Sequence, residues 1–149
     1  MHLLNKLKYL LRKQNKLPVD DLKQLKAKAL KAYEAAIERA NPFTAVQSCI
    51  RKYGLPEPKS GGKTLVIGVG KAAPAMINGL RSHINGPNNC ICITHKENKE
   101  NVDDCEMFKT GHPVPNEAGA LASKQVSSAC KKPDNNDHGL FLFSGCGSA

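Results

Sequence analysis

The chain has 149 residues, about the length of one domain, and 22 Lys and Arg against 13 Asp and Glu give it a formal net charge of +9 at pH 7. This length is enough to bury a core but excludes two full domains. The sequence has no secretory signal and no apolar run of about 20 residues, so we predict no membrane span.

Six cysteines, at positions 49, 90, 92, 105, 130 and 146, show no C-x-x-C pairing. Because structural zinc sites and disulfide frameworks usually show recurring Cys spacings, we predict neither. The sequence favours reduced, mostly buried thiols in an intracellular protein, with a cytoplasmic location.

The positive charge is concentrated near the start of the chain. Residues 1–31 hold nine Lys or Arg and two Asp, whereas residues 32–149 hold thirteen basic and eleven acidic residues. Residues 1–19 are interpreted as a basic amphipathic leader, whose leucines recur on one helical face. A mitochondrial presequence is the alternative, although such segments are usually rich in Arg and Ser. Tyr9 is the one aromatic residue of this leader, and the leader contains no recognised motif, so we do not predict that it binds nucleic acid.

Two helices are predicted before the first strand. Asp20 or Asp21 provides a helix start, and an apolar stripe runs to the stop at Asn41-Pro42. A second helix follows over 42–53 and ends at Gly54. The apolar stripe of the first helix, which has a basic outer face, consists of Leu22, Leu25, Ala29, Tyr33, Ala36, Ile37 and Ala40. The second helix is expected to bury Ala45, Val46, Cys49 and Ile50.

Residues 64–76 join a strand, a glycine turn and a helix start. The unbroken aliphatic run at 64–67 is typical of a central strand covered on both faces of a parallel sheet. Gly68 and Gly70 permit a tight turn, and the first amides of the next helix lack internal partners. Lys71 adds a positive charge where a helix already favours anions, so the turn predicts a phosphate or carboxylate site.

The motif also has a simpler structural explanation, in which the glycines only tighten the connection and Lys71 lies in solvent. It is not a Walker loop, because Ala72 follows Lys71 and Leu65 replaces the leading glycine. It matches G-x-G-x-x-A loosely, but no acidic partner for a ribose is evident.

Two further strands are predicted at 90–94 and 105–110, the second at the edge of the sheet. His95 ends the first of them, where open α/β sheets bind ligands, and is interpreted as a surface histidine within the exposed loop 95–104. Two prolines stiffen the loop at 111–115, where His112 either binds a ligand or holds the turn by a hydrogen bond. Asn116 then caps a helix with the apolar stripe Ala118, Leu121, Ala122, Val126 and Ala129.

A last apolar strand is predicted at 139–143, followed by a second glycine and serine turn at 144–149. Free amides and two hydroxyls in this turn could surround an oxyanion. A buried parallel strand normally requires a crossover helix, so we expect the chain to be the front part of a longer one. The predicted fold class is α/β, a Rossmann-like parallel-sheet domain preceded by N-terminal helices and apparently truncated.

Four segments in this order resemble the glycerate 2-kinases of the two-domain type, whose second half carries the MOFRL domain. They are Ala-Ala-Ile-Glu-Arg-Ala-Asn-Pro at 35–42, Gly-Val-Gly-Lys-Ala-Ala-Pro-Ala-Met at 68–76, Gly-His-Pro-Val-Pro-Asn-Glu-Ala-Gly at 111–119 and Leu-Phe-Ser-Gly-Cys-Gly-Ser-Ala at 142–149. The resemblance identifies residues 20–149 as an incomplete N-terminal domain. The chain departs from the family at Asn116, where Asp is usual, and at Cys146, where Gly is usual.

The resemblance implies transfer of the ATP γ-phosphoryl group, with Mg²⁺, to the 2-hydroxyl of D-glycerate, giving 2-phosphoglycerate. It implies a site between two domains, so that the missing C-terminal domain supplies the other half and the isolated chain is inactive. It identifies no metal ligand in this chain. Lys71 is the implied catalytic residue, and the implied substrate- or phosphate-binding residues are Gly68, Gly70, His112, Ser144, Gly145, Gly147 and Ser148.

Two other functions remain open from the sequence. One is a non-catalytic fragment that binds an anion or a partner chain, and the other is a dinucleotide-binding module based on the spacing of Gly68, Gly70 and Ala73.

Overall fold

A computed structural model describes residues 19–86 and 88–145 of the chain. The chain divides into two compact units, residues 1–40 and residues 41–149. Each unit is treated separately below. No helix among the described residues combines the length and the apolar character needed to cross a membrane.

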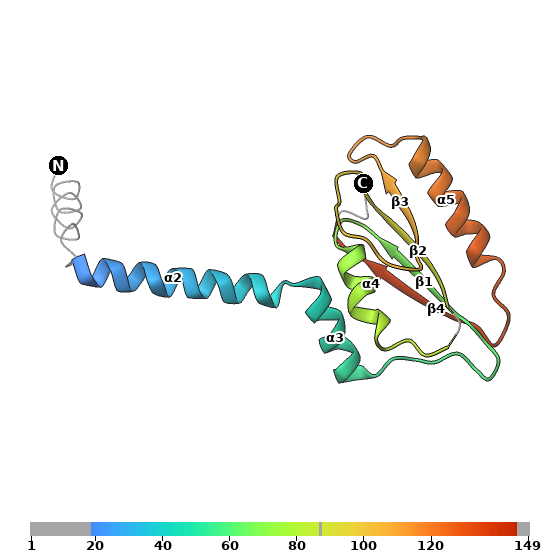
Figure 1. The fold of residues 1–149 in the computed structure, drawn as a ribbon, viewed down its shortest axis with the longest axis horizontal. Coiled ribbons are helices and arrows are strands. Elements are labelled where there is room, and N and C mark those ends of the chain that lie inside the picture. Colours follow the sequence, from blue (N-terminus) through green and yellow to red (C-terminus); the bar gives the residue numbers. More distant parts are fainter. Residues whose placement is uncertain (1–18, 87, 146–149) are drawn as a thin grey trace, which may run out of the picture. The chain divides into compact units, whose positions relative to one another are not determined.

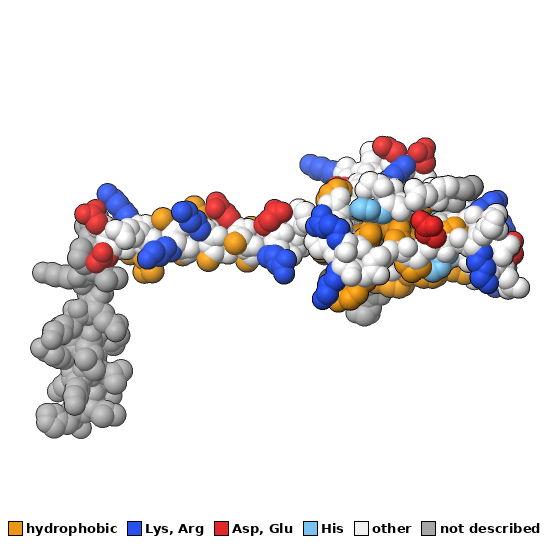
Figure 2. Space-filling model, turned by 90° about the horizontal axis from the view of Figure 1, so that it is seen from below, with side chains coloured by type: hydrophobic (Ala, Val, Ile, Leu, Met, Phe, Trp, Pro, Cys, Tyr) orange, Lys and Arg blue, Asp and Glu red, His pale blue; other side chains and the backbone are white. Residues whose placement is uncertain are grey.

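The described part of the first unit is helix α2 (Val19–Arg39). Asp20 and Asp21 lie in its first turn and Arg39 in its last, which complements the helix dipole. The helix predicted to run up to Asn41-Pro42 is therefore confirmed. Taken by itself, this helix exposes the large apolar side chains of its stripe, of which Leu22 is the least exposed at 42%. Figure 2 shows apolar side chains interspersed with charged ones along this helix.

The second unit is built on a sheet of four parallel strands in the order β3-β2-β1-β4 (Figure 1). The strands are β1 (Thr64–Val69), β2 (Asn88–His95), β3 (Glu106–Thr110) and β4 (His138–Phe143). The predicted α/β class with a Rossmann-like parallel sheet is confirmed. The central position of the 64–67 run and the edge position of the 105–110 strand are confirmed as well.

Helices cover both faces of this sheet. Helix α4 (Ala73–Arg81) packs against β1, β2 and β4, and α3 (Pro42–Tyr53) packs against α4. Helix α5 (Glu117–Cys130) lies over β3. Side chains alternate along β1, so that Val66 joins the core with α4 whereas Leu65 lines a cavity with α5. The two layers of helices are therefore on opposite faces.

The core lies between the sheet and helices α3 and α4. Its fully buried members include Val66, Ile77, Leu80 and Cys92, and Val46 is the buried residue that α3 contributes. The prediction that α3 also buries Ala45 and Cys49 is wrong, because both are exposed. Helical periodicity shows which residues share a face, but not how far the neighbouring elements cover it.

Both ends of α3 follow the predicted capping signals. The Asn41 side chain accepts hydrogen bonds from the Phe43 and Thr44 amides at 3.0 and 3.3 Å and starts α3. Gly54 ends α3 with a φ of 77° and donates its amide to Ile50 O at 2.8 Å. Left-handed backbone at this point favours glycine, which has no Cβ to collide with the preceding turn.

Strand β4 is confirmed, but it is an edge strand and not the buried strand expected. Phe141 and Phe143 are 51% and 64% exposed, with nearly parallel rings 6.4 Å apart. They lie on the α5 side of the sheet, because Phe141 pairs in register with Ile67, on the same face of β1 as Leu65. Leu121, on α5, is also exposed, contrary to its predicted place in a buried stripe.

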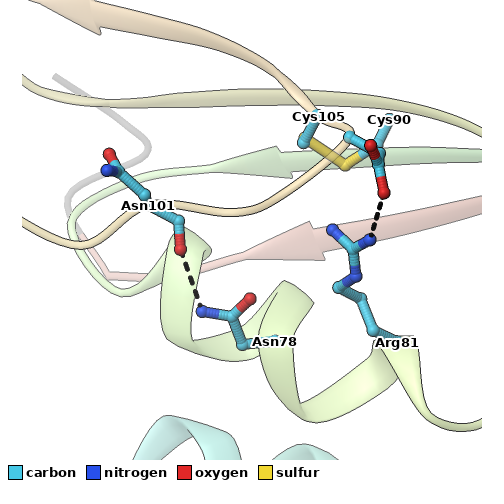
Figure 3. The surroundings of a disulfide bond; sticks show 6 residues. Asn78, Arg81, Cys90, Asn101 and Cys105 are labelled. Atoms are coloured by element: carbon cyan, nitrogen blue, oxygen red, sulfur yellow. Dashed lines mark hydrogen bonds and ion pairs between the residues drawn. A yellow bond between two sulfur atoms is a disulfide. The ribbon is translucent and has the colours of Figure 1, made fainter.

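The prediction that the chain has no disulfide is wrong. Cys90 and Cys105 form one, with their Cα atoms 4.6 Å apart (Figure 3). Ile91 pairs with Glu106 in the parallel register, so the residues just before them are neighbours, which spacing in sequence does not reveal.

The free cysteines are not mostly buried either. Cys49 and Cys130 are exposed, and only Cys92 of the described free thiols is buried. Burial raises the pKa of the Cys92 thiol to about 12, and the Glu100 carboxylate adds to the shift. Cys146 lies outside the described residues.

Candidate anion site at the carboxyl ends of the strands

The first glycine turn follows β1 at the carboxyl end of the sheet. Gly68 lies in β1, and a Cβ there would stand 2.6 Å from Ile77 Cδ1 and 3.2 Å from Ala73 Cβ. Its lack of a side chain therefore allows α4 to lie close to β1. The structure gives Gly68 a packing role that brings the helix start to the strand end.

The two predicted glycine turns are in contact. Gly70 has a φ of 115°, and a Cβ there would collide with Ser144 Oγ. Ser144 donates its amide to Val69 O at 3.0 Å, and its hydroxyl accepts a hydrogen bond from the Ala72 amide at 3.2 Å. Strand β4 thus places Ser144 against the turn that contains Lys71, although Ser144 and this turn lie more than 70 positions apart in the sequence.

Most amides of the first turn are already occupied, which corrects the expectation that they are free. Gly70 N–H donates to Ile93 O at 2.9 Å, and Ala73 N–H donates to Gly70 O at 3.2 Å. With Ala72 bound to Ser144, the Lys71 amide is the one in this turn that donates to no described residue. Anion binding here would depend more on the Lys71 ammonium group than on a row of amides.

A cavity of about 440 Å³ lies beside this turn, where β1, β2 and β3 end. Lys71, His95 and His112 all line it, and Lys71 is exposed. The rings of His95 and His112 lie edge to face with centroids 6.2 Å apart. The lining residues include no Asp or Glu, so the cavity suits an anion.

His95 was predicted to be a surface histidine, and its place in the cavity is a correction. It is half-buried, and its Nδ1 accepts a hydrogen bond from the Glu97 amide at 3.3 Å. Its position at the carboxyl end of β2 was the signal that could have identified it.

Asn116 connects the His112 loop to α5. Its side-chain oxygen accepts hydrogen bonds from the Gly111 and Gly119 amides, each at 3.1 Å. The predicted cap is confirmed. It also holds the ends of the Gly111–Pro115 loop, which places His112 over the cavity.

Asn98 is a part of this region that sequence reasoning missed. Its side-chain amide donates to Lys71 O at 2.8 Å and to Thr94 Oγ1 at 3.0 Å. A single Asn in a polar loop carries no pattern that would distinguish it from its neighbours, since its partners lie elsewhere in the chain.

The remaining predicted site residues are in the second turn. Gly145 is exposed, and a Cβ there would meet no atom within 4 Å. Gly147 and Ser148 lie outside the described residues. Among residues 19–86 and 88–145, no group of three or more His, Cys, Asp or Glu side chains is placed to hold a metal ion.

A second cavity, of about 510 Å³, lies at the amino ends of the strands. Both charge types line it, namely Lys63, Asp104, Glu106, Lys132 and Asp137. Asp137 accepts hydrogen bonds from the Lys63 amide at 2.7 Å and the Asp134 amide at 3.1 Å, and these bonds lower the pKa of its carboxyl group. The mixed charges give this cavity no preference for an anion.

Comparison with known proteins agrees with the fold and with the predicted resemblance. Residues 28–149 match the family model described as a domain of unknown function, DUF4147. The chain belongs to this family. The D-glycerate 2-kinase of Thermotoga maritima is 29% identical over 131 residues, and the glycerate 2-kinase of Pyrococcus horikoshii is 28% identical over 120 residues. A protein of Agrobacterium vitis provisionally named hydroxypyruvate reductase is 28% identical over 122 residues.

The crystal structure of glycerate kinase from Thermotoga maritima superposes on this DUF4147 chain with a TM-score of 0.72 at 28% identity. The match covers 83% of this chain and 29% of that one. The two kinase relatives are likewise matched over 30% and 27% of their length, and over 87% and 76% of this chain. The Agrobacterium protein is matched over 26% of its length and 78% of this chain. The chain therefore spans less than a third of each of these relatives. The resemblance to glycerate 2-kinases is confirmed.

Proposed function

We propose that this chain supplies part of the active site of an ATP-dependent glycerate 2-kinase, which phosphorylates D-glycerate to 2-phosphoglycerate. The observation that carries the proposal is the position of Lys71. It lies at the contact between two glycine turns, beside a cavity without carboxylates, in a chain whose relatives include named glycerate 2-kinases.

Phosphoryl transfer depends mainly on positioning and on positive charge around the transferred group. The Lys71 ammonium group can act as a point charge for the substrate carboxylate or for the phosphate. The Ser144 hydroxyl accepts from the Ala72 amide next to Lys71, and its O–H is a proposed donor to a ligand oxygen, although Ser144 itself is not among the residues that line the cavity. His112, across the cavity, offers a ring nitrogen to the same anion. Gly145, Gly147 and Ser148 are retained as proposed phosphate contacts.

ATP and Mg²⁺ are the cofactors that this function requires. The described residues do not fit a magnesium site, because Mg²⁺ prefers oxygen ligands and the cavity has no carboxylate among its lining residues. We therefore assign the ion no ligand in this chain. A cytoplasmic location is proposed with this function, and a mitochondrial one would require residues 1–19 to act as a targeting segment.

Two alternatives have an observation in their favour. A non-catalytic fragment that binds an anion fits a chain matched to 30% of a kinase relative. A dinucleotide-binding module fits the Gly68, Gly70 and Ala73 spacing and the provisional reductase name of one relative. Turnover by the chain would exclude the non-catalytic fragment, and binding of NADH would identify the dinucleotide module.

The proposal is tested by titrating the ¹⁵N-labelled chain with D-glycerate, MgATP and NADH, and by measuring ADP release with D-glycerate and MgATP. We expect D-glycerate or MgATP to shift the resonances of residues 68–72. The Lys71→Ala variant should weaken that binding about tenfold or more through loss of a charge-assisted contact. Lys124→Ala, which removes an exposed lysine on α5 outside the cavity lining, is the matched control.

Unchanged affinity in the Lys71 variant would contradict the proposed site. Release of ADP by the 149-residue chain would exclude the non-catalytic fragment. Binding of NADH alone would favour the dinucleotide module.

A further inference from the structure

We propose that Asn98 is a positioning residue for Lys71, an inference that rests on the proposed role of Lys71 in anion binding. Asn98 lies in the loop between β2 and β3 and is half-buried. Its side chain reaches across to the turn after β1. Nothing in the sequence pattern links these two segments.

Each polar atom of the Asn98 side chain is used. The amide nitrogen donates to Lys71 O at 2.8 Å and to Thr94 Oγ1 at 3.0 Å. The side-chain oxygen accepts from the Glu100 amide at 2.9 Å. Because Thr94 belongs to β2 and is only 2% exposed, Asn98 is anchored to a rigid part of the sheet.

The carbonyl that Asn98 binds is not used by the following helix. Ala73 N–H donates to Gly70 O, and Met76 N–H donates to Ala72 O. Neither of these backbone hydrogen bonds at the start of the helix uses Lys71 O as its acceptor. The amides of Gly70 and Ala72, the residues before and after Lys71, donate to Ile93 O and to Ser144 Oγ. Asn98 therefore completes the support of this turn.

The consequence for function follows from the form of the lysine side chain. Lys71 has a flexible stem, so the place of its ammonium group depends on how firmly its backbone is held. A binding group must be fixed by neighbours that are themselves locked in place. Asn98 meets this requirement without lining the cavity itself.

Two substitutions separate the donor of Asn98 from its acceptor. Asn98→Asp keeps an oxygen for the Glu100 amide but removes the donors to Lys71 O and Thr94 Oγ1. Asn98→Ala removes all three bonds without adding charge. Asn101→Asp is the control for the charge, because Asn101 is exposed and uses its backbone oxygen to accept from Asn78 (Figure 3).

The effect of Asn98 on the turn that contains Lys71 is measured first without a ligand, by amide hydrogen exchange in the full 149-residue chain. In both Asn98 variants we expect exchange at Ala72 and Ala73 to accelerate about fivefold or more, with Val66 in β1 unchanged. Asn101→Asp should leave all three rates unchanged. Wild-type exchange at Ala72 and Ala73 in both variants would overturn the proposal, as would global unfolding of both variants, which would make Asn98 a folding residue.

The ligand arm uses D-glycerate and MgATP as probes. Each Asn98 variant should weaken binding about three- to tenfold, the usual effect of one lost hydrogen bond, whereas Asn101→Asp should stay within about twofold. In a Lys71→Ala background, Asn98→Ala should cause no further loss. An equal loss in both backgrounds would show that Asn98 does not act through Lys71. If the wild type binds neither probe, the proposed function fails for this chain, and hydrogen exchange still decides whether Asn98 holds the turn.

Discussion

The carboxyl and amino ends of the strands carry cavities of similar size, about 440 and 510 Å³, with different chemistry. At the amino end the acidic groups have structural partners: Asp104 pairs with Arg81 at 3.1 Å, and Asp137 binds two backbone amides. At the carboxyl end Lys71 and two histidines line a cavity without any acidic residue. The acidic groups at the amino end thus have partners within the fold, whereas the basic groups at the carboxyl end are the ones that we propose for a ligand.

The disulfide gives the largest expected effect and belongs to the amino end. Cys90 and Cys105 are separated by 15 residues, and closing a loop of this size stabilises a protein by about 3 kcal/mol through the unfolded state. Reduction, or Ser at both positions, should lower the free energy of unfolding in urea by about this amount. Anion binding should persist in the reduced protein under conditions where it stays folded.

The control for this prediction is Ser at Cys49 and Cys130, both exposed and free. That variant should match the wild type under oxidising conditions. An unfolding midpoint that does not respond to reduction would mean that the Cys90–Cys105 bond contributes nothing to stability.

Gly70→Ala tests the carboxyl end, where structure and proposed function coincide. A Cβ at Gly70 would meet Ser144 Oγ, and the φ of 115° strains any other residue. We expect a loss of about 1–3 kcal/mol in the free energy of unfolding, the usual cost of such backbone strain. Binding of D-glycerate or MgATP should weaken in the same variant, because the two turns are pushed apart.

Gly61→Ala is the matched control for Gly70→Ala. Gly61 has a φ of 80°, but a Cβ there would meet no atom within 4 Å, so the substitution introduces the strain without the collision. This variant should lose stability and keep its ligand affinity. Equal ligand affinities for the wild type, Gly70→Ala and Gly61→Ala would show that ligand binding does not depend on the close contact between Gly70 and Ser144.

Elements with a local cause were predictable from the sequence. The aliphatic run at 64–67 specifies a buried strand, and Asn41, Gly54 and Asn116 cap helices through neighbours within a few positions. These interactions use residues that are close in the chain, so a pattern can reveal them.

Features that depend on strand register were not predictable. The Cys90–Cys105 bond, the contact of Ser144 with Ala72 and the bond from Asn98 to Lys71 each join segments that only the sheet brings together. The sequence indicated that two glycine turns exist. It did not indicate that the Ala72 amide, expected to be free, donates a hydrogen bond to the Ser144 hydroxyl. The predicted exposure was too high for His95 and too low for Leu121 for the same reason. A sequence pattern shows which residues share a face of a helix or strand, but not which element covers that face.

The smallest expected effect is the pH dependence supplied by Asp137 at the amino end. Backbone hydrogen bonds, first from Lys63 and then from Asp134, lower the pKa of this carboxyl group below its usual value. A lowered pKa means that the unfolded chain binds the proton more readily, so the contribution to stability is present above about pH 4 and is lost as the pH falls through the lower folded value. Asp137→Asn should therefore be less stable than the wild type at pH 7, and the difference should shrink on acidification below about pH 4 in urea unfolding curves.

The control is Asp103→Asn, which changes an exposed acid in another loop and should show neither effect. Because Asp137 lies at the opposite end of the strands from Lys71, its substitution should leave D-glycerate and MgATP affinity unchanged; a parallel loss of affinity would mean that the two ends are coupled through the sheet.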